Sequence, residues 1–152
     1  LASLRSALAA ALRSAGPASR PAGQSACALA FALAQLDEPA ECRARARECV
    51  AIGHAGNHGY LEIDGTVLAA RCTLALDDAA EAERLAQHAI VLAEGSPSYA
   101  RALAEAEVEL GRARAALGRT PEARRAFARA LVDARTALQA RNAVSGMLAL
   151  PR

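Results

Sequence analysis

The sequence predicts an all-α chain, and two features of its 152 residues support that prediction. Alanine is the commonest residue, and alanine, leucine, arginine and glutamate are the residues with the highest helix propensity. Residues that favour β-sheet are scarce, since aromatic residues make up only 3% of the chain and tryptophan is absent. With 53% hydrophobic residues the chain is too apolar for a disordered protein, and its length suits one domain.

Glycine and proline divide the chain into helical segments separated by short breaks. We expect a first helix over 1–15, a linker over 16–24, a helical repeat domain over 25–139 and a C-terminal tail over 140–152. Helix-start signals support the division, because Thr120 precedes Pro121 and Ser96 precedes Pro97. The helices expected within the repeat domain are 25–36, 39–52, 60–76, 78–93, 97–117 and 121–139.

Three of the breaks, at 35–39, 75–79 and 116–121, recur at intervals of 40 and 41 residues. Each is followed by an alanine-rich helix with small or apolar residues on one face. The matching sets are Cys42, Ala46, Cys49 and Val50; Ala82, Ala86, Ala89 and Ile90; and Ala123, Phe127, Ala130 and Leu131. A period of this length is typical of units that bury their apolar faces by stacking. The pattern predicts three antiparallel helical hairpins, preceded by an extra helix that is a cap or the end of another hairpin.

The segment 104–131 resembles the tetratricopeptide repeat family. The matching residues are Leu110 and Gly111 in the first helix, Gly118 at the turn, and Ala123, Phe127, Ala130 and Leu131 in the second helix. The resemblance covers roughly 24–139, and the spacing of about 40 residues is similar to that of longer hairpins in bacterial signalling and regulatory proteins. It implies an α-solenoid whose first helices line a concave groove for a protein or peptide.

The resemblance also implies which side chains line this groove. Phe31, Arg71 and Arg112 occupy matching positions, one in each repeat. The accompanying candidates are two acids, each seven residues before an arginine, and three apolar residues on nearby turns: Asp64, Glu105, Val67, Leu74 and Val108. Two stacked arginines could hold a carboxylate or a phosphate of a partner. The alternative is that each arginine pairs with its neighbours and the groove is unused.

The charge pattern gives little support for a nucleic acid partner. The net charge is +2, with an acidic middle and a basic C-terminal third. Arg124, Arg125, Arg129 and Arg135 form a basic face on the last expected helix, but the sequence has no base-reading motif and no interleaved aromatic residues. We therefore expect this face to be solvated or to contact a neighbouring helix.

No cluster of residues predicts catalysis, a cofactor or a metal, and we do not expect an enzyme. Cys49, His54 and His58 have a spacing that could supply zinc ligands, but the surrounding glycines favour an exposed turn. The four cysteines, at 27, 42, 49 and 72, form no CxxC pair, so we expect free thiols in a reducing cytoplasm. Glu105, Glu107 and Glu109 alternate along a helix, which predicts a solvated face.

The expected function is protein–protein interaction, as a scaffold or recognition module. The alternative is a sensor or regulatory fragment of a larger bacterial transcription activator, signalling ATPase or Ser/Thr kinase. We expect the chain to be a piece of a longer protein, although the first 25 residues also have the composition of an organellar transit peptide. The longest uncharged run, 21–36, is too short and too polar to span a membrane.

Overall fold

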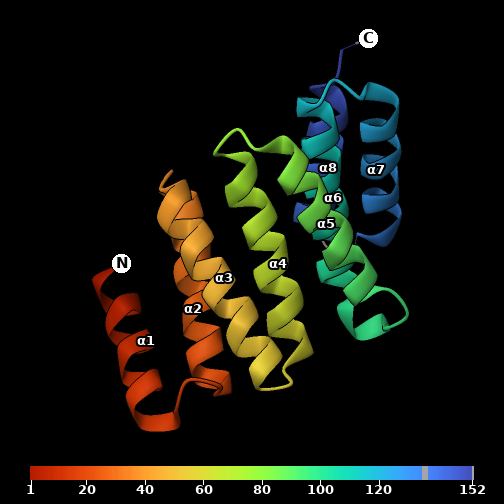
Figure 1. Cartoon of the computed structure of the whole chain (residues 1–152). Helices are drawn as coiled ribbons and strands as arrows, with labels where there is room; N and C mark the ends of the chain where they lie inside the picture. Colours follow the sequence, from red (N-terminus) through yellow and green to blue (C-terminus); the bar gives the residue numbers. More distant parts are fainter. Residues whose placement is uncertain (135–136, 152) are drawn as a thin grey trace.

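The structure is a computed structural model that describes residues 1–134 and 137–151, without the side chains of 137–139. The described part of the chain is all-α, which confirms the predicted fold class (Figure 1). Its helices are α1 (Ala2–Ala15), α2 (Arg20–Gln35), α3 (Pro39–Ala55), α4 (Gly59–Leu74), α5 (Ala79–Ala93), α6 (Ala100–Ala116), α7 (Thr120–Asp133) and α8 (Ala137–Leu148), with a 3₁₀ turn at Pro97–Tyr99.

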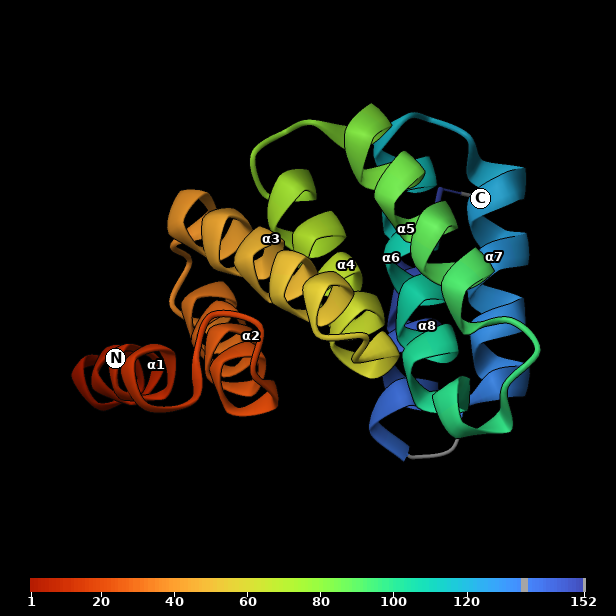
Figure 2. The same cartoon turned by 60° about the horizontal axis from the view of Figure 1, so that its bottom comes forward.

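The helices form three antiparallel hairpins, α2–α3, α4–α5 and α6–α7, flanked by α1 and α8. Consecutive helices pack against each other along the whole chain. The first helices of successive hairpins also make contact, α2 with α4 and α4 with α6, and α6 contacts the flanking helix α8 in the same way. Figure 2 shows the resulting progression from α1 at one end to α7 and α8 at the other. The inner helices α4 and α6 are therefore surrounded by neighbours on several sides.

The turn between the two helices of each hairpin has the same backbone geometry. Its central residue, Asp37, Asp77 or Gly118, adopts a left-handed conformation with φ of 57°, 61° and 73°. Glycine, aspartate and asparagine are the residues that tolerate this conformation. The amide after the central residue donates to a carbonyl five residues back: Glu38 to Leu33, Asp78 to Thr73 and Arg119 to Arg114. The cap recurs at intervals of 40 and 41 residues, in agreement with the repeat spacing read from the sequence, and it also occurs at Asn57 between α3 and α4.

Several boundaries differ from those expected. The helix expected over 97–117 begins as a 3₁₀ turn at Pro97–Tyr99, and α7 ends at Asp133, inside the helix expected over 121–139. Helix α2 begins at Arg20, inside the expected linker, because the Ser19 side chain accepts a hydrogen bond from the Ala22 amide and Pro21 suits the first helical turn. Helix α8 occupies most of the expected tail. The ring of Phe127 packs where Gly111 of α6 and Gly146 of α8 leave no room for a Cβ atom, so the two glycines let these helices close around it.

The small residues predicted at the core of the second helices are buried. Their exposed fractions are 0–1% at Cys42, Ala46, Cys49, Ala82, Ala86, Ala89, Ala123, Phe127 and Ala130. Burial is less uniform at the last position of each set, because Ile90 is buried while Leu131 of the hairpin α6–α7 is 39% exposed. The expected apolar face is therefore confirmed in all three hairpins.

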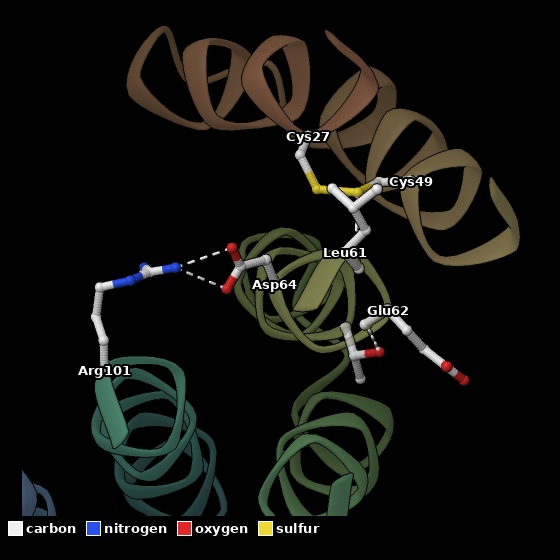
Figure 3. Close-up of a disulfide and its surroundings, with 7 residues drawn as sticks. Cys27, Cys49, Leu61, Glu62, Asp64 and Arg101 are labelled. Carbon is white, nitrogen blue, oxygen red and sulfur yellow. Dashed lines mark hydrogen bonds and ion pairs between the residues drawn. A yellow bond between two sulfur atoms is a disulfide. The ribbon is translucent and has the colours of Figure 1, made fainter. Parts of the chain in front are cut away.

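The expectation of free thiols is wrong for this structure. Cys27 of α2 is bonded to Cys49 of α3, and Cys42 of α3 is bonded to Cys72 of α4, so all four cysteines are paired (Figure 3 shows the first pair beside Leu61 of α4). The Cα atoms are 5.3 Å and 5.9 Å apart, within the range that disulfides require. Sequence spacing did not reveal these pairs because the packing of adjacent helices determines them.

Candidate functional site

A groove pocket is lined by side chains from the first helices of the three hairpins and from α8. Its volume is about 360 Å³. The lining residues are Phe31 and Gln35 of α2, Arg71 of α4, Glu105 and Arg112 of α6, and Arg141 and Asn142 of α8. Phe31, Arg71 and Arg112, predicted as one residue per repeat, thus meet in one pocket together with Glu105. Residues up to 111 positions apart in the chain form a single surface because the first helices pack in series.

Glu109 connects the two predicted arginines. Its Oε1 atom accepts a hydrogen bond from Nε of Arg71 at 2.8 Å and another from Nη1 of Arg112 at 2.9 Å. The glutamate side chain is only 1% exposed, whereas those of Arg71 and Arg112 are 25% and 39% exposed. The arrangement fixes both guanidinium groups at the pocket wall and leaves part of each accessible. Two positive charges against one buried negative charge leave this cluster net positive.

The other predicted residues do not line this pocket. Asp64 faces Arg101 of α6, whose Nη2 atom lies 2.9 Å from both carboxylate oxygens (Figure 3). Burial raises the pKa of Asp64, and the attraction of Arg101 opposes that rise. Val67 and Val108 are core residues with exposed fractions of 2% and 4%, so their assignment to the groove surface is corrected. Leu74 is half-buried outside the pocket.

Four residues of the groove were not predicted from the sequence: Gln35, Glu109, Arg141 and Asn142. Gln35 lies four residues after Phe31 and was identifiable as its neighbour on the same helical face. Arg141 and Asn142 were assigned to the C-terminal tail, so their position on a helix beside the groove was not predicted. Glu109 lies three residues before Arg112, a pairing distance in a helix, but it was assigned to a solvated face.

The expected solvated face of α6 is a further correction, because Glu107 and Glu109 are buried and only Glu105 is half-buried. Glu107 lies 2.8 Å from Nε of Arg129, measured at Oε1. Burial raises the pKa of Glu107 from its ordinary value of 4.5 to about 7, against the attraction of Arg129 and with a further rise from Asp133. The alternation of these glutamates predicted a solvated face, but α6 has neighbouring helices on several sides, so side chains that point in different directions are buried.

The basic face of α7 is partly used inside the molecule. Arg129 contacts Glu107 and also lies 3.7 Å from Glu94, the residue that follows α5, while Arg125 lies 3.8 Å from Glu122. Arg124 and Arg125 are exposed, and Arg135 lies outside the described residues. This face therefore contacts neighbouring helices at Arg129, as one of the two expected arrangements requires.

The possible zinc ligands do not converge. Cys49 is bonded to Cys27, and Nδ1 of His54 lies 3.3 Å from a carboxylate oxygen of Glu62. Across residues 1–134 and 137–151 no three His, Cys, Asp or Glu side chains are grouped so as to hold a metal ion. Over the same residues, every helix is too short or too polar to cross a bilayer.

Comparison with known proteins finds no matching family model, no matching curated protein and no matching solved structure. The groove geometry and the sequence pattern therefore provide the basis for a functional proposal.

Proposed function

We propose that this chain is a protein-interaction module of the tetratricopeptide type, which binds an acidic protein or peptide segment in the groove between its first helices. The observation that supports the proposal is the convergence of Arg71, Arg112 and Arg141 on one pocket. Three helices each contribute one of these arginines, so the positive surface depends on the stacking of the hairpins.

The charges in the groove favour an anionic partner. Glu105 lines the pocket but accepts a hydrogen bond from Arg101 at 2.9 Å, so its charge is offset within α6. Glu109 offsets one of the charges of Arg71 and Arg112. Arg141 is exposed and forms no ion pair with any side chain that the structure describes. Guanidinium groups bind carboxylates through paired hydrogen bonds, so an acidic side chain or a chain terminus fits this surface.

Phe31 gives the groove an apolar component. Its side chain is 53% exposed although it is the largest apolar side chain of α2, and it forms part of the same pocket wall. Exposed aromatic residues beside arginines are typical of protein-binding surfaces. The partner segment is therefore expected to place an aliphatic portion over Phe31 while its carboxylate contacts the arginines.

The test measures binding of a fluorescein-labelled hexaglutamate peptide to the oxidised chain by fluorescence anisotropy, with hexaglutamine as the neutral comparison. Arg141→Glu is the main variant, because Arg141 is exposed and its replacement breaks no internal ion pair. The matched control is Arg125→Glu, which makes the same charge change at an exposed position on α7. We expect Arg141→Glu to weaken hexaglutamate binding roughly threefold to tenfold and Arg125→Glu to change it far less.

Glu109→Gln provides a test in the opposite direction. The buried glutamate competes with a partner carboxylate for Arg71 and Arg112, so its neutralisation is expected to tighten hexaglutamate binding. Helicity measured by circular dichroism checks that each variant is folded. Equal effects of Arg141→Glu and Arg125→Glu, or no difference between hexaglutamate and hexaglutamine, would contradict the proposal.

The cytoplasmic location expected from the sequence depended on free thiols. With all four cysteines paired, the thiol state no longer supports that location and favours an oxidising compartment. Alkylation of the protein directly in its cells, followed by counting of the modified cysteines, distinguishes the two locations.

A further inference from the structure

A second pocket lies beside the groove pocket, between the N-terminal parts of α4 and α6. Its volume is about 260 Å³, and it is lined by Tyr60, Asp64, Ser98, Tyr99, Arg101 and Ala102. Both tyrosines of the chain line this pocket. Asp64 was predicted as a groove residue, whereas no role was predicted for either tyrosine.

The side chains of this pocket are held in place by contacts with neighbouring helices. Arg20 of α2 lies over the ring of Tyr60, 5.3 Å from its centroid, and donates a hydrogen bond from Nε to the tyrosine hydroxyl at 3.0 Å. The hydroxyl of Tyr99 packs beside Gly59, where a Cβ atom would lie 3.1 Å from it. The two rings are half-buried and thus form walls rather than mobile surface groups.

The guanidinium group of Arg101 is fixed from two directions. Nη2 donates to both oxygens of Asp64 at 2.9 Å, and Nη1 donates to Glu105 at 2.9 Å. The two carboxylates offset the charge of Arg101, and the hydrogen bonds fix the orientation of its guanidinium plane. A pocket with two phenol rings, a fixed guanidinium plane and no excess positive charge favours an aromatic side chain over an acidic one, because aromatic rings stack on both kinds of surface.

The two pockets are neighbours along the same groove. Glu105 lines the groove pocket and is bonded to Arg101, which lines the second pocket. On α4, Asp64 lines the second pocket and Arg71 lines the groove pocket. The two residues are seven positions apart, which corresponds to about 10 Å along a helix. In a polyproline II helix, side chains three residues apart point to the same side at a spacing of about 9 Å.

We infer that the second pocket binds an aromatic side chain of the partner segment, three residues away from the acidic residue held by the arginines. This inference rests on the proposed function, because it specifies the partner of the same groove. The partner is therefore an extended, polyproline-like segment that carries an acidic and an aromatic residue with two residues between them.

The test uses fluorescein-labelled proline-rich peptides and the oxidised full chain. One peptide contains Glu-Pro-Pro-Phe and a second contains Phe-Pro-Pro-Glu, because an extended segment can lie along a groove in either direction. In each, a matched peptide has alanine in place of phenylalanine, and another has a single proline between the two residues. We expect phenylalanine to tighten binding roughly threefold to tenfold in one direction, and only with two prolines between the residues.

Protein variants assign that gain to the second pocket. Ser98→Phe fills the pocket from an exposed position, so it is expected to abolish the gain from phenylalanine and leave binding of the alanine peptide unchanged. Ser6→Phe, at an exposed position on α1, is the matched control and is expected to keep the gain. Tyr99→Leu is expected to reduce the gain, with helicity measured as a check on folding.

The outcomes separate this inference from the proposed function. If the phenylalanine and alanine peptides bind equally and Arg141→Glu weakens both, the groove binds acidic segments and the aromatic pocket is overturned. A gain that survives Ser98→Phe, or that is independent of spacing, also overturns it. If none of the acidic peptides binds, the proposed function and this inference fail together.

Discussion

The two halves of the molecule hold equivalent hairpins together by different means. In the hairpin α2–α3, the core positions Cys42 and Cys49 are joined by disulfides to α4 and α2. The matching positions of the later hairpins are alanines, Ala82 and Ala89 in one and Ala123 and Ala130 in the other. The same helical template therefore tolerates a covalent bond between helices or a close contact of small side chains.

The later hairpins have ion pairs on buried or half-buried carboxylates instead. Glu83 of α5 bonds Arg114 of α6 and Arg119, Glu107 contacts Arg129 of α7, and Glu109 joins Arg71 to Arg112. These pairs link neighbouring helices much as the disulfides do in the first half. They differ in their sensitivity, because a disulfide responds to reductant and a buried carboxylate responds to pH.

Reduction of the disulfides is expected to have the largest effect, and to act on one half. The bonds close segments of 22 and 30 residues, for which loss of each cross-link costs about 3 kcal/mol of unfolding free energy in the chain-entropy account. In the folded state the sulfurs of Cys42 and Cys49 lie 3.2 Å and 3.4 Å from the carbonyls of Ala30 and Leu61, which can accept a hydrogen bond from each thiol. The reduced chain is therefore expected to fold but to be less stable.

Hydrogen exchange followed by mass spectrometry, with and without reductant, locates this effect. Amides of α2, α3 and α4 should exchange faster after reduction, while those of α6 and α7 should change little. The variant Cys27→Ala/Cys49→Ala should reproduce part of the change without reductant. A uniform increase over all helices would show that the two halves are not held separately.

The difference between the halves also explains what the sequence could predict. The hairpin turns were predictable because Asp37, Asp77 and Gly118 act through local backbone geometry. Phe31, Arg71 and Arg112 were predictable as groove residues because the repeat places one on each first helix. The disulfide pairs and the burial of Glu107 depend on which faces of adjacent helices meet, and a helical period alone does not determine that.

Val67 and Val108 illustrate the same point. Val67 is one helical turn from Arg71 and Val108 one turn from Arg112, so spacing alone placed them beside the groove. Helices α4 and α6 contact neighbours on several sides, which leaves only a narrow strip of each facing the groove. The valines fall outside that strip and enter the core.

A second, smaller effect is expected from Glu107 in the ion-paired half. Its pKa is about 7 in the folded chain against an ordinary value of 4.5, so the folded state holds its proton more tightly than the unfolded state. The stabilisation from this proton is complete below pH 4.5 and is lost as the pH rises to about 7. Glu107→Gln is expected to remove this pH dependence and to raise stability at pH 8 by on the order of 1–3 kcal/mol.

Urea denaturation between pH 4 and pH 8 measures this effect, and Glu105→Gln is the matched control on the same helix. The control is expected to retain the decline in stability that the wild-type chain shows over this range. Parallel pH profiles for wild type and Glu107→Gln would contradict the assignment. The comparison also tests whether pH acts on the later hairpins while reductant acts on the earlier ones.

The smallest effects are expected where the two halves are alike, at the turns. Asp37 of the first half and Gly118 of the later half occupy matching left-handed positions, and a Cβ atom added at Gly118 would meet nothing within 4 Å. Because aspartate and glycine both tolerate this conformation, Asp37→Gly and Gly118→Asp are each expected to change the unfolding free energy by less than about 1 kcal/mol. Alanine lacks the short polar side chain that stabilises left-handed aspartate, so Gly118→Ala and Asp37→Ala should each cost about 1 kcal/mol or more. Thermal unfolding of the four variants measures the differences. If Gly118→Asp costs more than Gly118→Ala, the turns are not equivalent, and the two halves differ in their backbone as well as in the contacts between their helices.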